Sequence, residues 1–164
     1  MRRFLVACLF LLGFTLIEKG ILSNIIFLKN IPDFIFLCSI YFSVQNGRLF
    51  GSLTGFTGGL FLDFLTPCPF GFNCLLRTIL GYFFGFFNKT LNINGFLFPV
   101  LVGFVGTLIK FFLLKLICVF YPNISIQYSI ISIEFLEEIL FNSFFAPLVF
   151  RFLDLFKKSL VSEK

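Results

Sequence analysis

Histidine and tryptophan are absent from the sequence, and charged residues make up only 13% of its 164 positions. Without histidine, the chain offers no His-based catalytic triad or dyad and no His-containing zinc site. Ordinary soluble domains carry about 25% charged residues. A soluble domain of this length would also have too little interior to bury the 59% of residues that are hydrophobic. Together with a mean hydropathy of +1.03, this composition predicts an integral membrane protein.

Phenylalanine supplies 30 of the residues, whereas alanine occurs only at positions 7 and 146. Because phenylalanine has A/T-rich codons, as do isoleucine, asparagine and lysine, we interpret it as the default apolar residue of this chain and not as an aromatic ligand cage. The five cysteines are odd in number and form no CxxC motif. They are therefore predicted to be free thiols packed as small hydrophobic groups.

The N-terminus resembles a signal peptide, because Arg2 and Arg3 precede an apolar stretch over 4–17. After Ile17, however, the chain lacks the small-x-small pattern of a cleavage site. Further apolar segments follow, so we expect the first one to be retained as a membrane helix.

Five more apolar runs follow, separated by polar residues, glycines and prolines. A bilayer-spanning helix needs about 20 apolar residues, with about 17–25 tolerated. Pro32 and Asp33 suit the start of a helix, while Pro69 and Gly71 mark a turn between two helices. The sequence therefore predicts one all-α membrane domain over 1–164, a bundle of about six transmembrane helices. The predicted spans are 4–22, 31–44, 49–65, 71–87, 95–121 and 134–156.

Lysine and arginine placement predicts the orientation of this bundle. With a cytoplasmic N-terminus, two cations (Lys19 and Lys29) fall outside, three (Arg77, Lys110 and Lys115) fall within spans, and the remaining eight of the 13 fall inside. The eight are Arg2, Arg3, Arg48, Lys89, Arg151, Lys157, Lys158 and Lys164. This distribution favours six spans, with both termini in the cytoplasm.

Glycine recurs every four residues in the third predicted span. Residues four apart lie on one helix face, and a face without side chains lets another transmembrane helix approach closely. The same spacing recurs in the fourth span. We favour packing within the chain over an intermolecular contact. The predicted packing residues are Gly47, Gly51, Gly55, Gly59, Gly81 and Gly85.

Several ionisable residues fall within the predicted spans, where each costs at least about 2.5–3.5 kcal/mol at the bilayer centre unless it is paired. Folding the third and fourth spans as a hairpin brings Asp63 near Arg77. Folding the last two about position 127 brings Lys115 near Glu137 and Glu138. We interpret these groups as structural ion pairs; the alternative is a proton or substrate pathway.

Catalysis would require a nucleophile with a base, or clustered metal-binding carboxylates. Only Glu134, Glu137 and Glu138 are clustered in the sequence. We therefore expect no enzymatic activity, no catalytic residues, no cofactor and no metal, and no binding of nucleic acid.

Residues 31–85 resemble the MreD family of bacterial rod shape-determining membrane proteins. The family pattern "PD, apolar span, GxxxGxxxGF, GLxxD" matches Pro32–Asp63, and its "PxGxxxL" turn matches Pro69–Leu75. A "GYxxG" motif follows at Gly81–Gly85. The chain departs from the family in its phenylalanine content and in Arg77, where an uncharged residue is more usual.

The resemblance implies a non-enzymatic scaffold of the cell-elongation complex in the bacterial inner membrane, surrounded by lipid. Its implied partners are MreC-like and MreB-like proteins and cell-wall synthases. The family is also similar in fold to the substrate-binding subunits of energy-coupling-factor vitamin transporters, which gives the alternative function. Those subunits dock through an Ala-xxx-Ala face on the first helix, whereas here the small residues gather in the third span.

Overall fold

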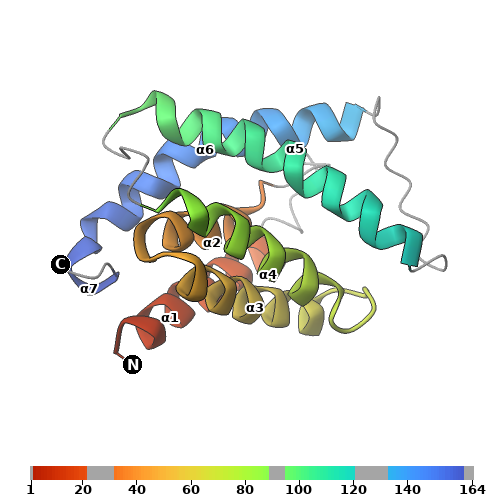
Figure 1. Ribbon diagram of the computed structural model, residues 1–164, viewed down its shortest axis with the longest axis horizontal. Coiled ribbons are helices and arrows are strands. Elements are labelled where there is room, and N and C mark those ends of the chain that lie inside the picture. The colour runs from red at the N-terminus through yellow and green to blue at the C-terminus, as the bar shows by residue number, and fades with distance from the viewer. Residues whose placement is uncertain (1, 22–31, 89–94, 121–132, 161–164) are drawn as a thin grey trace.

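Helices form all the regular structure in the part of the chain that the computed structural model describes, residues 2–21, 32–88, 95–120 and 133–160 (Figure 1). In chain order they are α1 (Arg2–Leu16), the π-helix η1 (Ile17–Ile21), α2 (Phe34–Asn46), α3 (Arg48–Leu65), α4 (Phe72–Phe84), the 3-10 helix η3 (Gly85–Phe87), α5 (Leu97–Phe120), α6 (Ile133–Leu155) and α7 (Lys157–Leu160). Each of the six predicted spans overlaps one of the helices α1 to α6. The all-α class is therefore confirmed.

Among the residues that the structure describes, length and composition alone identify one helical segment that could cross a membrane, Leu97–Val119 in α5, with a mean hydropathy of 2.2. The 13 residues of α2 extend only about 20 Å at 1.5 Å per residue, against a hydrocarbon core of about 30 Å. Helix α6 is long enough but carries five charged residues. The prediction of six membrane spans is thus not confirmed by the helices themselves.

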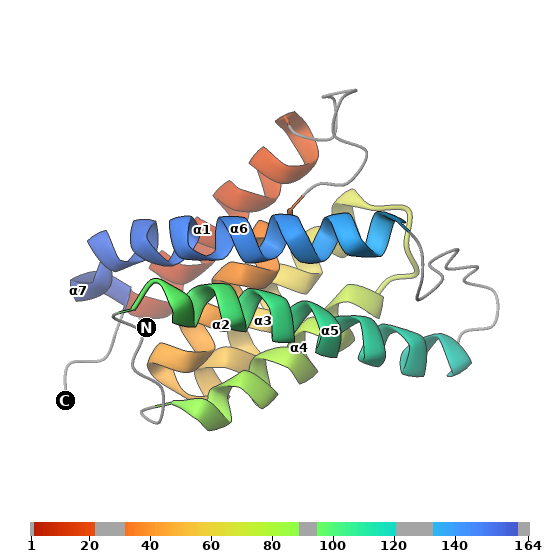
Figure 2. The ribbon, with the colours of Figure 1, turned by 90° about the horizontal axis from the view of Figure 1, so that it is seen from above.

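Helix α2 is the centre of the bundle. Its residues from Ile35 to Val44 are all buried, as expected for a helix that is apolar on every side. Helices α3 and α4 pack closely against each other on one side of α2, and α5 pairs with α6 on the other side (Figure 1). Figure 2 shows α5 and α6 running side by side across the bundle. Helix α1 packs against α2 and α3.

The outer surface of the bundle is strongly apolar. Helices α1, α3, α4, α5 and α6 all expose large hydrophobic side chains, such as Leu9 at 74%, Phe64 at 68% and Phe112 at 68% exposure. Contiguous apolar surface of this kind is unfavourable in water and marks a membrane or protein contact. Phenylalanine lies both in the core and on this surface, which agrees with its interpretation as a general apolar residue.

Candidate functional site

Helices α3 and α4 meet along a line of glycines, which we call the glycine seam: Gly51, Gly55, Gly59, Gly81 and Gly85. A methyl group placed on Gly55 would come within 3.0 Å of the Arg77 backbone, and one on Gly59 would meet the Cys74 backbone equally closely. The ladder predicted from sequence therefore packs within the chain, backbone against backbone, as transmembrane helices do where small residues face each other.

Gly47 has a further role besides packing, as the turn between two helices. It separates α2 from α3 with a φ of 91°, a left-handed conformation that favours glycine. A methyl group there would meet nothing closer than 3.9 Å. Gly47 is therefore a turn residue, and its backbone borders the end of the seam, where a methyl group added to Gly85 would come within 2.9 Å of the Gly47 carbonyl carbon.

Asp63 caps the N-terminus of α4. Its carboxylate accepts hydrogen bonds from the backbone N–H groups of Gly71, Asn73 and Cys74 at 3.0, 3.0 and 3.2 Å, and from the Asn73 side-chain amide at 2.9 Å. These donors are the N–H groups that a helix leaves unpaired at its start. The turn itself begins as predicted, with the Phe72 N–H donating to the Pro69 carbonyl and Gly71 at a φ of 93°.

The predicted Asp63–Arg77 pair is wrong. Arg77 binds Asp33 instead, with its Nη2 donating to the two carboxylate oxygens at 2.9 and 2.8 Å. In the seam, Gly51 faces Gly81 and Gly55 faces Arg77, so the hairpin is shifted by about five residues from the predicted register. Asp63 consequently lies beside the turn, and the Arg77 side chain reaches the start of α2.

Asp33 is the centre of a buried polar cluster. The side chains of Asp33 and Arg77 are only 8% and 4% exposed. Asp33 caps α2 by accepting from the Phe36 N–H at 2.9 Å, which agrees with its prediction as a helix-start residue beside the buried Pro32. Its own N–H donates to Asn142 Oδ1 on α6 at 2.9 Å.

Lys110 closes the cluster from α5. Its Nζ donates to Asp33 Oδ2 and, at 2.7 Å, to Glu138 Oε1 on α6. Nearby, the amide of Asn142 donates to Thr107 Oγ1 at 3.1 Å. We call Asp33, Arg77, Lys110, Glu138, Asn142 and Thr107 the ion network; it joins α2, α4, α5 and α6 at one point.

The predicted pairing of Lys115 with Glu137 or Glu138 is also wrong. Lys115 is exposed, with its Nζ 5.6 Å from the centre of the Phe111 ring. Gly103 faces Asn142 and Ala146, so α5 and α6 pair about six residues out of the predicted register. This shift brings Lys110 to Glu138 in place of Lys115.

The ion network is neutral overall, because two carboxylates balance two cations. Arg77 Nε and Nη1 have no hydrogen-bond partner among the residues that the structure describes. The stabilisation of the buried guanidinium charge therefore depends strongly on Asp33. The described residues also contain no group of three or more Cys, Asp or Glu placed to hold a metal ion. The arrangement can hold four helices in one register.

Sequence reasoning missed Lys110, Thr107 and Asn142 as members of the network. One signal was present: Lys110 lies in the middle of the most apolar helix, where an unpaired cation would be costly. No comparable local signal marks Asn142, which is fully buried and has its two partners on other helices.

A comparison with protein families matches residues 1–156 of the chain to the model described as rod shape-determining protein MreD. No curated protein and no solved structure matches the chain. The match covers both halves of the sequence, including α5 and α6, which lie beyond the motif region 31–85. The chain therefore belongs to the MreD family, a family of membrane proteins that determine rod shape.

Proposed function

We propose that this protein is a non-enzymatic membrane scaffold of the bacterial cell-elongation complex. It helps to couple an MreB-like filament and an MreC-like protein to the enzymes of peptidoglycan synthesis. Membership of the MreD family supplies the coarser part of this function, a role in rod shape determination. The partners and the coupling role are our proposal.

The observation that carries the proposal is that the interior charges are paired with one another. A transport or catalytic site needs ionisable groups that can meet a substrate. Here Asp33, Arg77, Lys110 and Glu138 form direct ion pairs across four helices. Such a network fixes a shape, and a fixed apolar surface is what a scaffold offers to its partners.

We also place the protein in the inner membrane, crossing it several times with both termini in the cytoplasm. Helix α1 contacts α7, the short helix that follows α6, and the Phe10 and Phe156 rings pack 5.2 Å apart. Both ends of the chain are basic, with Arg2 and Arg3 at one and Lys157 and Lys158 at the other. This arrangement fits the bias of cytoplasmic segments towards lysine and arginine.

Reporter fusions test this topology. Alkaline phosphatase, which is active only outside the cytoplasm, should be inactive when fused after Lys164 and active when inserted between α5 and α6, within 121–132. Immunoblots of both fusions control for expression. An active fusion after Lys164 would rule out the arrangement with both termini inside.

Depletion tests the function. Reducing the protein in its own cells should change cell width and misplace new wall, because the synthases would lose their connection to the filament. Width is measured by microscopy, and wall placement by a pulse of fluorescent D-amino acid. Normal width and normal wall placement after depletion would contradict the proposal.

No finding favours the alternative of a vitamin-transporter subunit. Calorimetry of the purified protein with riboflavin, thiamine and biotin distinguishes the two functions. A scaffold should give no binding heat. A nanomolar dissociation constant, about −12 kcal/mol, would replace the scaffold with a substrate-binding subunit.

A further inference from the structure

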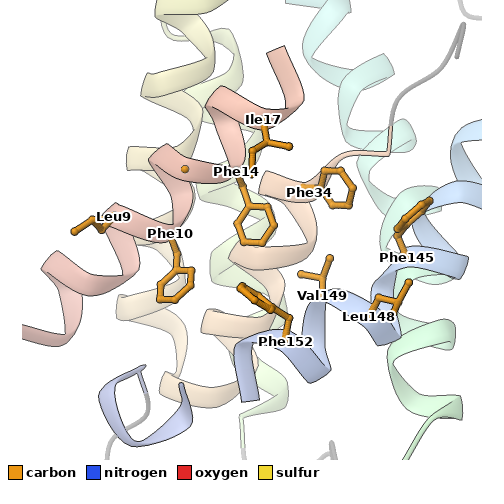
Figure 3. Close-up of a pocket in the computed structure, with 10 residues that line it drawn as sticks. Leu9, Phe10, Phe14, Ile17, Phe34, Phe145, Leu148, Val149 and Phe152 are labelled. Carbon is orange, nitrogen blue, oxygen red and sulfur yellow. The ribbon is translucent and has the colours of Figure 1, made fainter. Parts of the chain in front are cut away.

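An apolar groove runs between α1 and α6 on the outside of the bundle. It is formed by residues within 9–17, which cover α1 and the first residue of η1, and within 145–152 of α6, with Phe34 at one end, and has a volume of about 520 Å³. Every residue that lines it is apolar. Figure 3 shows side chains of the two helices, including Phe14 and Phe152, facing each other across it. We call it the α1/α6 groove.

Aromatic contacts form the base of this groove. The rings of Phe10 and Phe14 both pack against Phe152, at 6.2 and 6.1 Å, and Phe34 packs against Phe145 at 5.5 Å. Gly13 lies at the middle of the α1 side, and a methyl group added there would meet nothing within 4 Å. The groove is therefore open where Gly13 stands.

The two ends of the groove differ in charge. At the Phe34 end, Glu18 is buried and pairs with Lys19 at 3.2 Å. Towards the Phe10 end, where α1 contacts α7, the helices carry three exposed cations, Arg3, Arg151 and Lys157, none of which pairs with an acidic side chain elsewhere in the described ranges. We call these three residues the basic cluster.

The residues of the basic cluster are close in sequence to residues at the Phe10 end of the groove. Arg3 precedes Phe10 by seven residues, two turns back on the same face of α1. Arg151 is adjacent to Phe152, and Lys157 follows Phe156, whose ring packs on Phe10 at 5.2 Å. The apolar α1/α6 groove thus has positively charged residues towards one end.

We infer that the α1/α6 groove binds an anionic phospholipid, with one acyl chain along the groove and the phosphate at the basic cluster. The acyl chain needs no hydrogen-bond partner, and the side chains that line the groove offer none. The volume lies within the range of about 300–1,000 Å³ that is usual for small-ligand pockets. Basic residues at the membrane surface attract anionic head groups, so charge complementarity selects this occupant.

A partner's transmembrane helix is the competing occupant. A helix that crosses the bilayer needs about 20 residues and about 30 Å of contact. The groove extends over only about 12 Å along α1 and the start of η1, from 9 to 17 at 1.5 Å per residue. A helix docked there also has no need of a phosphate-binding end, which the basic cluster provides.

Native mass spectrometry of the purified full-length protein tests this inference. The protein is exchanged into detergent containing equal amounts of dioleoyl phosphatidylglycerol and dioleoyl phosphatidylcholine. We expect one phosphatidylglycerol to remain bound, at least tenfold in excess over phosphatidylcholine. Equal retention of the two lipids, or no retained lipid, would overturn the inference.

Two variants separate the groove from its charged end. Gly13→Leu should fill the groove and abolish lipid retention, while Gly95→Leu, a matched change at another glycine with nothing within 4 Å, should retain the lipid. The triple variant Arg3→Gln, Arg151→Gln, Lys157→Gln should lose the tenfold preference for phosphatidylglycerol but still retain a lipid chain. Thermal unfolding checks that each variant is folded.

Three other outcomes would contradict parts of this inference. If Gly13→Leu retains phosphatidylglycerol as the wild type does, the lipid binds elsewhere and the groove assignment fails. If Gly13→Leu instead releases a co-purifying membrane protein while lipid retention is unchanged, the groove binds a partner helix. If the triple variant keeps its preference, the basic cluster does not hold the head group. None of these outcomes bears on the proposed role in cell elongation, which depletion tests separately.

Discussion

Replacing Asp33 with asparagine should lower the free energy of unfolding by about 3–5 kcal/mol, the usual cost of removing one partner from a buried ion pair. The substitution leaves Arg77 without its carboxylate, and Arg77 is only 4% exposed. Asparagine retains an oxygen that can cap α2 at Phe36, so the loss measures the missing charge. Unfolding in mild detergent, followed by circular dichroism, gives the value. The amount of protein in membranes should fall with it.

Two further variants test whether the lost stability comes from the unpaired charge of Arg77. Adding Arg77→Gln to Asp33→Asn removes the stranded cation and leaves Lys110 paired with Glu138, so most of the lost stability should return. Asp154→Asn is the matched control, since Asp154 accepts a hydrogen bond from the Tyr41 hydroxyl at 2.7 Å and pairs with no cation in the described part of the chain. It should change stability by about 1 kcal/mol or less. The ion network would lose its structural role if Asp33→Asn behaved like Asp154→Asn.

The positions of the helices could be predicted from sequence because their signals are local. Apolar runs, prolines and glycines act on neighbouring residues. Helix α3 ends at Leu65, directly before Thr66 and Pro67, and α2 begins at Phe34, directly after Asp33. The glycine face could also be predicted, because residues four apart lie on one side of a helix.

The partners of the charges could not be predicted from sequence in the same way. Asp33 lies 44 residues from Arg77 and 77 from Lys110, and no local pattern records such a contact. The predicted pairs came from folding each hairpin about its loop, which assumes a register. The true registers differ by about five or six residues, more than one helical turn, and this is enough to change which residue faces which.

The glycine seam sets one of these registers. Gly55 lies against the Arg77 backbone, so the closest contact between α3 and α4 occurs at the residue whose side chain holds Asp33. The seam and the ion network are therefore adjacent through Arg77. A change that separates the two helices should also move the guanidinium away from its carboxylate.

Replacing Gly55 with leucine should therefore lower the free energy of unfolding by about 3 kcal/mol or more. Overpacking typically costs about 1–3 kcal/mol, and here the obstacle is backbone, which cannot rotate aside as a side chain does. Gly95→Leu is the matched control, because the same side chain would enter open space outside the α1/α6 groove. It should leave the free energy of unfolding nearly unchanged. Unfolding in detergent compares the two.

A double-mutant cycle then tests whether seam and network act as one unit. If Gly55→Leu already withdraws Arg77 from Asp33, adding Asp33→Asn should cost less than it does alone. Coupling between residues that share a partner typically reaches about 0.5–3 kcal/mol, whereas independent sites add to within about 0.5 kcal/mol. Strict additivity would show that α3 and α4 can separate without disturbing the ion pair. Gly55→Leu unfolding at the wild-type temperature would show that the helices do not pack as closely as the seam requires.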